Sequence, residues 1–179
     1  MSVPNYEAII AWAAVAAALV AVAAVLVTIV IAVRESHRSR IALGVDLLMK
    51  LDDRFNGSMQ EARATAARGL LAHRPGDSED VLDFFETLEM LIREGVLGEE
   101  FVWHTFFHWI RGYRQAAQGH VRASREQEPT VWQDFERLYR RTARLEMQKR
   151  CCSMSELELT EDQTQQFLAD EAGLAEAGA

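Results

Sequence analysis

The stretch EFVWHTFFHWIRGYRQ, residues 100–115, has the strongest helical pattern in the chain and decides the fold class. On a helix of about 3.6 residues per turn, its apolar side chains cover nearly half of the circumference. These side chains are Val102, Trp103, Phe106, Phe107, Trp109, Ile110 and Tyr113. A helix with so wide an apolar face packs against several neighbours. We therefore expect residues 100–115 to form the central core helix of an all-α domain.

The segments before this helix repeat the same period, and turn residues separate them. An apolar stripe predicts a helix over residues 39–55, which Asn56-Gly57 would end. Ser58 and Glu61 have the spacing of a capping box, so the next helix should begin there and run to about residue 73. A further helix is predicted over residues 78–94, because its apolar residues recur every three or four positions.

Turn residues also mark the helices that follow. Gly95 suits the left-handed cap of the 78–94 helix, and Gly98 opens the central helix. The last helix should begin near Pro129, since proline favours the first turn. Its inward residues would be Val131, Trp132, Phe135, Leu138, Tyr139 and Leu145. We therefore expect residues 34–152 to form a cytoplasmic bundle of about four to five helices.

The acidity of the chain is concentrated at its end. The formal net charge is -8, and the chain after Cys152 contains seven acidic residues and no basic one. All 19 Lys and Arg lie between Arg34 and Arg150, together with 19 of the 27 acids. We expect residues 153–179 to form an acidic, partly disordered tail. The nearly neutral body argues against binding of nucleic acid.

An uncharged apolar segment, residues 8–33, precedes the bundle. Its 26 residues would span about 39 Å as a helix, more than the roughly 30 Å of bilayer hydrocarbon. A cleavable signal peptide is the alternative, but it needs a basic start and a shorter apolar core. Residues 8–33 are therefore predicted to form a single transmembrane helix that continues into the bundle.

The charges beside this segment predict its orientation. Arg34, Arg38 and Arg40 follow it, whereas Glu7 is the only charged side chain before it. The positive-inside rule then places residues 1–7 outside and the body in the cytoplasm, at the inner (plasma) membrane of a bacterium. The expected partners are the lipid bilayer and another membrane or cytoplasmic protein. Small residues four apart, such as Ala14 and Ala18, would also allow a homodimer through this helix.

Potential metal ligands are stacked one turn apart at Glu100, His104 and His108. They share the face of the central helix with Arg111 and Gln115, opposite the aromatic residues, so we expect them to face water. A closed metal site needs ligands from a second element, and no other histidine cluster provides them. The adjacent Cys151 and Cys152 lack the spacing of a zinc or redox motif, so two reduced thiols are expected. We predict no metal and no cofactor.

Four charged residues fall on apolar stripes, where exposure to solvent does not explain them: Asp52, Arg63, Glu89 and Arg114. Burying such groups singly is costly, so we predict a structural polar network of ion pairs, with Arg114 and Glu89 as one pair. No nucleophile elbow or glycine-rich phosphate loop occurs, and no catalytic residue is predicted. The leading hypothesis is an interaction or scaffold module. The alternative is a small enzyme or ligand sensor that uses these carboxylates and arginines as a pocket.

Three stretches resemble a bacterial family. They are LMKLDDRFNGSMQEAR at 48–63, DFFETLEMLIREGVLGEEFVW at 83–103 and WQDFERLY at 132–139. The family consists of short proteins with one N-terminal transmembrane helix and a helical domain of unknown function. The similarity covers roughly residues 40–140 and is closest at Asp52, Arg54, Phe55, Arg63, Phe85 and Gly95. It implies the helical fold and the membrane anchor, and no activity.

Overall fold

The computed structural model describes residues 28, 31, 34–35 and 42–174. The chain consists of two compact units, residues 1–42 and residues 43–179. No helix among the described residues is long and apolar enough to cross a membrane. The predicted transmembrane segment, residues 8–33, lies outside the described residues except for Thr28 and Ile31.

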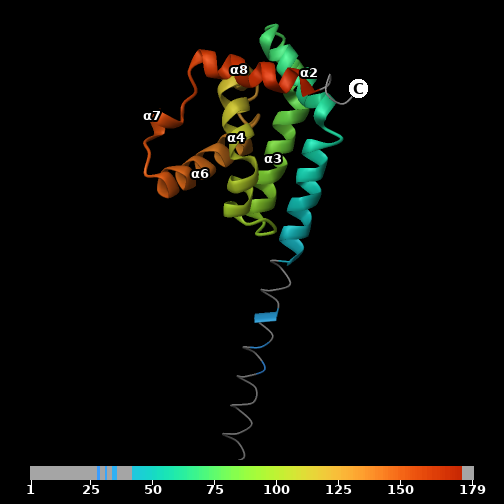
Figure 1. The fold of residues 1–179 in the computed structure, drawn as a ribbon, viewed down its shortest axis with the longest axis vertical. Coiled ribbons are helices and arrows are strands. Elements are labelled where there is room, and N and C mark those ends of the chain that lie inside the picture. Colours follow the sequence, from blue (N-terminus) through green and yellow to red (C-terminus); the bar gives the residue numbers. More distant parts are fainter. Residues whose placement is uncertain (1–27, 29–30, 32–33, 36–41, 175–179) are drawn as a thin grey trace, which may run out of the picture. The chain divides into compact units, whose positions relative to one another are not determined.

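All regular structure in the described residues is helical, as predicted (Figure 1). Residues 42–56 form the first helix of the body. It is followed by α2 (Gln60–Leu71), the 3-10 turn η1 (Pro75–Ser78), α3 (Glu79–Arg93), α4 (Glu99–Ala116), α5 (Gln118–Gln127), α6 (Gln133–Arg150), α7 (Met154–Leu157) and α8 (Glu161–Ala172). The described part of the body therefore contains more helices than the four to five expected.

Helix α4 is the central helix that the sequence predicts. It contacts α3, α5, α6 and α8. The side chains of Val102, Phe106, Ile110 and Tyr113 have no exposed surface. The rings of Phe106 and Phe84 meet edge to face, with centroids 5.6 Å apart, a favourable aromatic geometry. Burial of one wide apolar face against four neighbours thus fixes the position of α4 in the core.

Turn residues define the boundaries of α3 and α4 as expected. Gly95 has φ +68° after the end of α3, a conformation that favours glycine. Gly98 is the N-cap of α4. The capping box predicted at Ser58 is not formed, because α2 begins at Gln60 and the Ser58 hydroxyl instead donates to the Arg54 carbonyl (3.4 Å). Backbone hydrogen bonds from the amides of residues 59 and 60 continue the preceding turn there.

Helix α6 begins later than Pro129, because Trp132 adopts a left-handed conformation (φ +48°). This conformation places the indole in the core, where its exposed fraction is 7%. The Glu86 carboxylate on α3 accepts hydrogen bonds from the amides of Asp134 (3.1 Å) and Phe135 (3.5 Å). A side chain from a neighbouring helix therefore caps α6, an arrangement without a local sequence signal.

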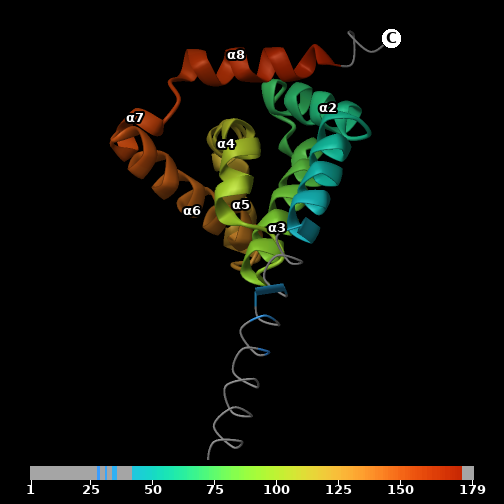
Figure 2. The same cartoon turned by 60° about the horizontal axis from the view of Figure 1, so that its bottom comes forward.

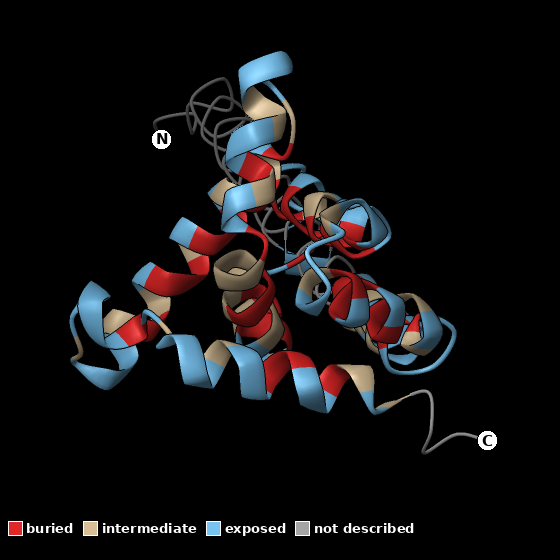
Figure 3. Ribbon diagram, turned by 90° about the horizontal axis from the view of Figure 1, so that it is seen from above, coloured by how far each residue is buried: buried red, intermediate tan, exposed pale blue. Residues whose placement is uncertain are grey.

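The acidic tail differs most from the expectation. Its residues 161–172 form α8, which begins with a capping box between Thr160 and Gln163. Helix α8 contacts both α2 and α4, and Figure 2 shows it passing over the end of α4 and lying beside α2. Figure 3 shows buried residues in its C-terminal half, namely Phe167, Leu168 and Glu171. Up to residue 172 the tail is therefore part of the folded body.

Candidate functional site

The structure does not bring Asp52, Arg63, Glu89 and Arg114 together in one network. Each of the four has a different partner. Asp52 accepts a hydrogen bond from the side-chain amide of Asn56, one turn along the same helix (2.8 Å). This contact is local, so it links no separate parts of the body.

The predicted pair between Glu89 and Arg114 is replaced by two other pairs. Arg141 on α6 donates two hydrogen bonds, of 3.0 and 3.3 Å, to the fully buried Glu89 carboxylate. Arg114 lies over the Tyr139 ring (4.6 Å), and its Nε is 3.6 Å from Glu136 Oε1. The reason is that α6 packs against both α3 and α4. It supplies the partners for both residues.

Arg63 forms a buried ion pair with Glu171, a residue of the acidic tail. The guanidinium donates two parallel hydrogen bonds to the carboxylate, from Nε (2.8 Å) and Nη2 (2.7 Å). Only 3% of Arg63 and 6% of Glu171 is exposed. The Arg63 guanidinium also lies 4.2 Å from the centroid of the Phe55 ring. Such a two-pronged pair, stacked on an aromatic ring, fixes the geometry of both partners.

Two side chains of α4 complete the hydrogen bonds of the Glu171 carboxylate. Trp109 Nε1 donates to Oε1 (3.0 Å), and the Tyr113 hydroxyl donates to Oε2 (2.9 Å). Burial, and next the negative charge of Glu171, raise the pKa of Tyr113, so the phenol stays protonated as a donor. We call Arg63, Glu171, Trp109 and Tyr113 the Arg63–Glu171 cluster. Each carboxylate oxygen accepts two hydrogen bonds, which leaves the cluster closed to an added ligand.

A hollow lies on another side of α4, between α4 and α6, with a volume of about 400 Å³. We call it the α4–α6 pocket. Its lining residues are Trp103, His104, Phe107, His108 and Arg111 from α4, and Glu146 and Arg150 from α6. Glu146 accepts hydrogen bonds from Trp103 Nε1 (2.8 Å) and forms an ion pair with Arg150 (2.8 Å). The only carboxylate in the lining is therefore already bound.

Arg111 has no acceptor in this pocket. Its Nε is buried, and neither an ion pair nor a hydrogen bond to its side chain is found in the described part of the chain. The guanidinium lies 5.9 Å from the centroid of the Phe107 ring. After burial, the positive charge of Arg111 contributes to the lowered pKa of His108, and it opposes the rise that burial causes in the pKa of Tyr139. The pocket therefore has one positive charge that no residue of the described chain neutralises.

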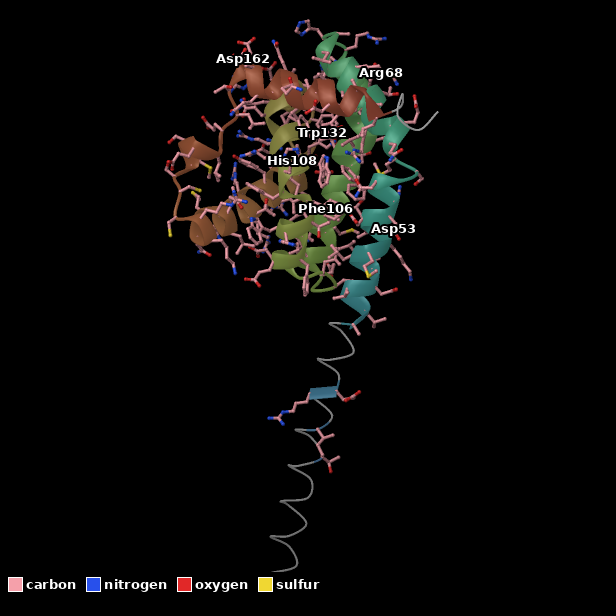
Figure 4. The ribbon with its side chains drawn as sticks, viewed as in Figure 1. Asp53, Arg68, Phe106, His108, Trp132 and Asp162 are labelled. Carbon is pink, nitrogen blue, oxygen red and sulfur yellow. The ribbon has the colours of Figure 1, made fainter. Side chains whose placement is uncertain are left out.

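His108 lies on α4 (Figure 4) and packs against α8. The centroid of its ring is 5.6 Å from that of Phe167 on α8. Burial, and then the charge of Arg111, lower the pKa of His108. His104, one turn before it, also lines the pocket. The lowered pKa favours the neutral form of the His108 imidazole beside the charged Arg111 guanidinium.

The residues considered as metal ligands separate in the structure. His104 and His108 line the α4–α6 pocket, whereas Glu100 binds Lys149 of α6 (2.9 Å). Among the described residues, no group of three or more His, Cys, Asp or Glu side chains could hold a metal ion. Cys151 and Cys152 are free thiols.

A second, larger hollow of about 640 Å³ lies between α3, α5 and the turn before α6. Its lining includes Glu79, Asp83, Glu86 and Glu128. Burial raises the pKa of Glu86, but this carboxylate already caps α6. Asp83 accepts a hydrogen bond from Trp132 Nε1 (3.3 Å). Two of the four carboxylates in this hollow, those of Asp83 and Glu86, therefore bind groups at the start of α6.

Sequence reasoning did not predict the α4–α6 pocket. It placed His104, His108 and Arg111 on one face, which we expected to be in water. Glu146 and Arg150 were missed, because the α6 pattern says nothing about which face of α4 it covers. Glu171 was missed as well, although the capping box at Thr160 and the apolar pair Phe167-Leu168 are signals of a docked helix.

The model of a family described as a domain of unknown function (DUF4760) matches residues 10–142. No match was found among curated proteins or among solved structures. The matched range includes α4 and the start of α6, and it excludes α8.

Proposed function

We propose that this chain, which belongs to the family of domains of unknown function DUF4760, is a single-pass membrane protein whose helical body serves as an interaction module. Residues 8–33 would span the membrane, with residues 1–7 outside and the body in the cytoplasm. The family match begins at Ile10, so it includes most of the apolar segment. This extent supports the anchor as a family feature.

One surface feature carries the proposal. Exposed apolar side chains gather at the end of the body where the helix of residues 42–56 begins. Leu43 is 65% exposed, Val96 42% and Phe101 44%. Gly44 packs so closely on the Val96 carbonyl that an added Cβ would lie 2.8 Å from its oxygen, which places the α3–α4 turn beside Leu43. Because the chain toward the proposed anchor leaves the body here, this apolar end is suited to contact the membrane or a membrane-bound partner.

The rest of the body supports a rigid module. The Arg63–Glu171 cluster joins α2, α4 and α8. Arg141 joins α6 to α3 and α4, since it binds both Glu89 (3.0 Å) and Glu99 (3.2 Å). Such cross-links hold a surface in one shape, and a preorganised surface loses less entropy when a partner binds. The proposed partners are the lipid bilayer and another membrane or cytoplasmic protein. A homodimer through residues 8–33 is also proposed.

Two measurements test the proposal. A fluorescent protein fused to the C-terminus should fluoresce, and alkaline phosphatase at the same position should be inactive; the reverse result would contradict the topology. A photo-crosslinking residue at position 96 of the full chain should give adducts with lipid or protein in native membranes. The control is position 71, because Leu71 has the same 42% exposure at the end of α2. Equal adducts at both positions would contradict an interaction surface at the apolar end.

A ligand sensor is the second candidate function, and the α4–α6 pocket favours it. The arginine–carboxylate pocket first considered for this role is occupied by internal ion pairs. Arg111, in contrast, is a partly buried cation beside a hollow of about 400 Å³. Thermal stability of the purified full chain, measured across a panel of small anions and neutral analogues, separates this candidate from a pure scaffold. A scaffold without a ligand would respond to none of them.

A further inference from the structure

The α4–α6 pocket contains an arginine that differs from the other unpaired arginines of the body. Arg54, Arg122, Arg140 and Arg144 are exposed, so water solvates their charge. Arg111 is partly buried, and its Nε has no hydrogen-bond acceptor; Arg114 Nε also lacks a hydrogen bond, but it lies 3.6 Å from the Glu136 carboxylate, whereas Arg111 has no carboxylate partner in the described chain. A buried donor without a partner is costly, and native structures rarely keep one without a reason. A ligand in the pocket would reach the Nη groups, which also have no acceptor in the described chain and are accessible to solvent, and the positive charge makes an anion the expected partner.

The groups around Arg111 indicate what kind of anion fits. The guanidinium fork matches the two oxygens of a carboxylate. Trp103 and Phe107 supply aromatic surface in the same lining, which favours a ligand with an apolar or aromatic body. Because Arg150 already neutralises Glu146, the excess charge in the lining is that of Arg111 alone. One excess positive charge is matched by one carboxylate.

We propose that the α4–α6 pocket binds a small aromatic or similarly apolar carboxylic acid, with its carboxylate on Arg111 and its apolar part against Trp103 and Phe107. His104 and His108 flank the carboxylate as additional hydrogen-bond donors. The pocket volume of about 400 Å³ is within the usual range for small-molecule sites. This site lies entirely within the body, so it does not depend on the proposed membrane anchor.

The test uses the full-length chain, purified in detergent, and benzoate as the probe. Isothermal titration should detect benzoate binding to the wild type. Acetate lacks the ring and benzamide lacks the charge, so both should bind at least about tenfold more weakly, the effect of losing one charge-assisted contact or one buried ring. Tighter binding of acetate or benzamide than of benzoate would overturn the proposal. Tighter binding of inorganic phosphate would replace the carboxylate with a phosphate group and would also overturn it.

Variants locate the binding site. Arg111→Met keeps much of the side-chain length without the charge, and it should weaken benzoate binding by about tenfold to a hundredfold. Arg122→Met removes an exposed arginine of α5 and should leave the affinity unchanged. Arg111→Lys keeps the charge without the fork, so an intermediate affinity is expected. If Arg111→Met does not fold, Arg111→Lys and Trp103→Leu still test the site. Benzoate binding that survives all these changes would exclude the α4–α6 pocket.

Discussion

On each of two sides of α4, an arginine lies near aromatic rings. Only one of these two arginines is paired with a carboxylate of the described chain. On the α8 side, Arg63 lies over Phe55 and meets a carboxylate whose four hydrogen bonds are filled. On the α6 side, Arg111 lies near Phe107 and meets no carboxylate. The difference comes from the partner helix, since α8 supplies Glu171 whereas α6 pairs Glu146 with Arg150.

This difference separates a structural role from a binding role for the same residue type. An arginine whose carboxylate is part of the fold stabilises the fold, and its removal leaves a buried charge unpaired. An arginine without an internal carboxylate adds little to stability and leaves its hydrogen bonds for a ligand. Stability measurements and binding measurements should therefore respond to opposite sides of α4.

The largest effect is expected from Arg63→Met, which removes the arginine of the Arg63–Glu171 cluster on the α8 side of α4. The variant leaves Glu171 buried without a counter-charge, so the free energy of unfolding should fall by about 3–5 kcal/mol. Urea unfolding followed by circular dichroism measures this loss. Arg68→Met is the matched control on the same helix. Its ion pair with Glu61 is exposed (side chains 50% and 74%), so its loss should cost at most about 1 kcal/mol.

The double variant Arg63→Met/Glu171→Met tests the cause of that loss. It removes both charges and should recover much of the stability, because the cost of burying the pair disappears as well. Additive losses in the double variant would show that Glu171 does not act as the partner of Arg63. The comparison of the two sides of α4 would then fail.

The helices were predictable from the sequence where the apolar period and a flanking glycine indicate the same helix boundary. Residues 78–94 and 100–115 correspond to α3 and α4, and Gly95 and Gly98 mark the boundary between them. Helix α5 was not predictable from the same signals, because Val121 is its only buried residue. A short helix with one buried side chain has no periodic pattern to detect.

The partners of the charged residues were beyond sequence reasoning for a different reason. Arg63 and Glu89 lie on apolar stripes of their helices, a position that predicts burial, and both are buried in the structure. Their partners lie 108 and 52 positions away along the chain. Pairing at such separations depends on how whole helices pack, and helix periodicity contains no information about it. The α4–α6 pocket was out of reach in the same way.

A smaller effect is expected from Gly112→Ala, which disturbs the packing of α8 against α4 without removing a charge. An added Cβ would lie 2.5 Å from the Phe167 ring, so the ring and α8 must shift. Overpacking of this kind costs about 1–3 kcal/mol. Gly119→Ala on α5 is the control, since nothing lies within 4 Å of its added Cβ, and helix propensity should raise stability there by up to about 1 kcal/mol. Equal melting temperatures for both variants would mean that α8 is not packed at Gly112.

Arg111→Met tests the α6 side of α4, where the arginine has no carboxylate partner in the described chain. The residue has no ion pair to lose in the described chain, so the unfolding free energy without ligand should stay within about 0.5 kcal/mol of the wild type or rise. The same substitution at position 63 should cost several times more. Thermal unfolding of both variants in the same buffer measures the contrast. A loss at Arg111 as large as that at Arg63 would mean that Arg111 has a structural acceptor.

The last prediction concerns the pH dependence of stability and His108. Burial and the charges of Arg111 and Arg63 lower the pKa of His108, while Glu171 and Asp170 oppose this shift; Glu146 and Arg150 line the same pocket. Because the folded-state pKa lies below the unfolded value of about 6.5, the unfolded chain binds the proton first as the pH falls. Stability from this residue is therefore present at pH 7.5 and decreases below about pH 6.5, until His108 in the folded state is also protonated.

His108→Gln should remove this decrease and leave the stability at pH 7.5 nearly unchanged. The effect should stay below about 1 kcal/mol, because the imidazole is only partly buried and solvent screens its interactions. Urea unfolding at pH 7.5 and pH 5.5, with wild type and variant side by side, isolates the contribution. Benzoate in the α4–α6 pocket should favour the protonated imidazole and reduce the decrease in the wild type alone. If the wild type and His108→Gln respond equally to pH with and without benzoate, His108 neither loses its hydration nor meets the carboxylate. The α4–α6 pocket would then be ordinary solvated surface.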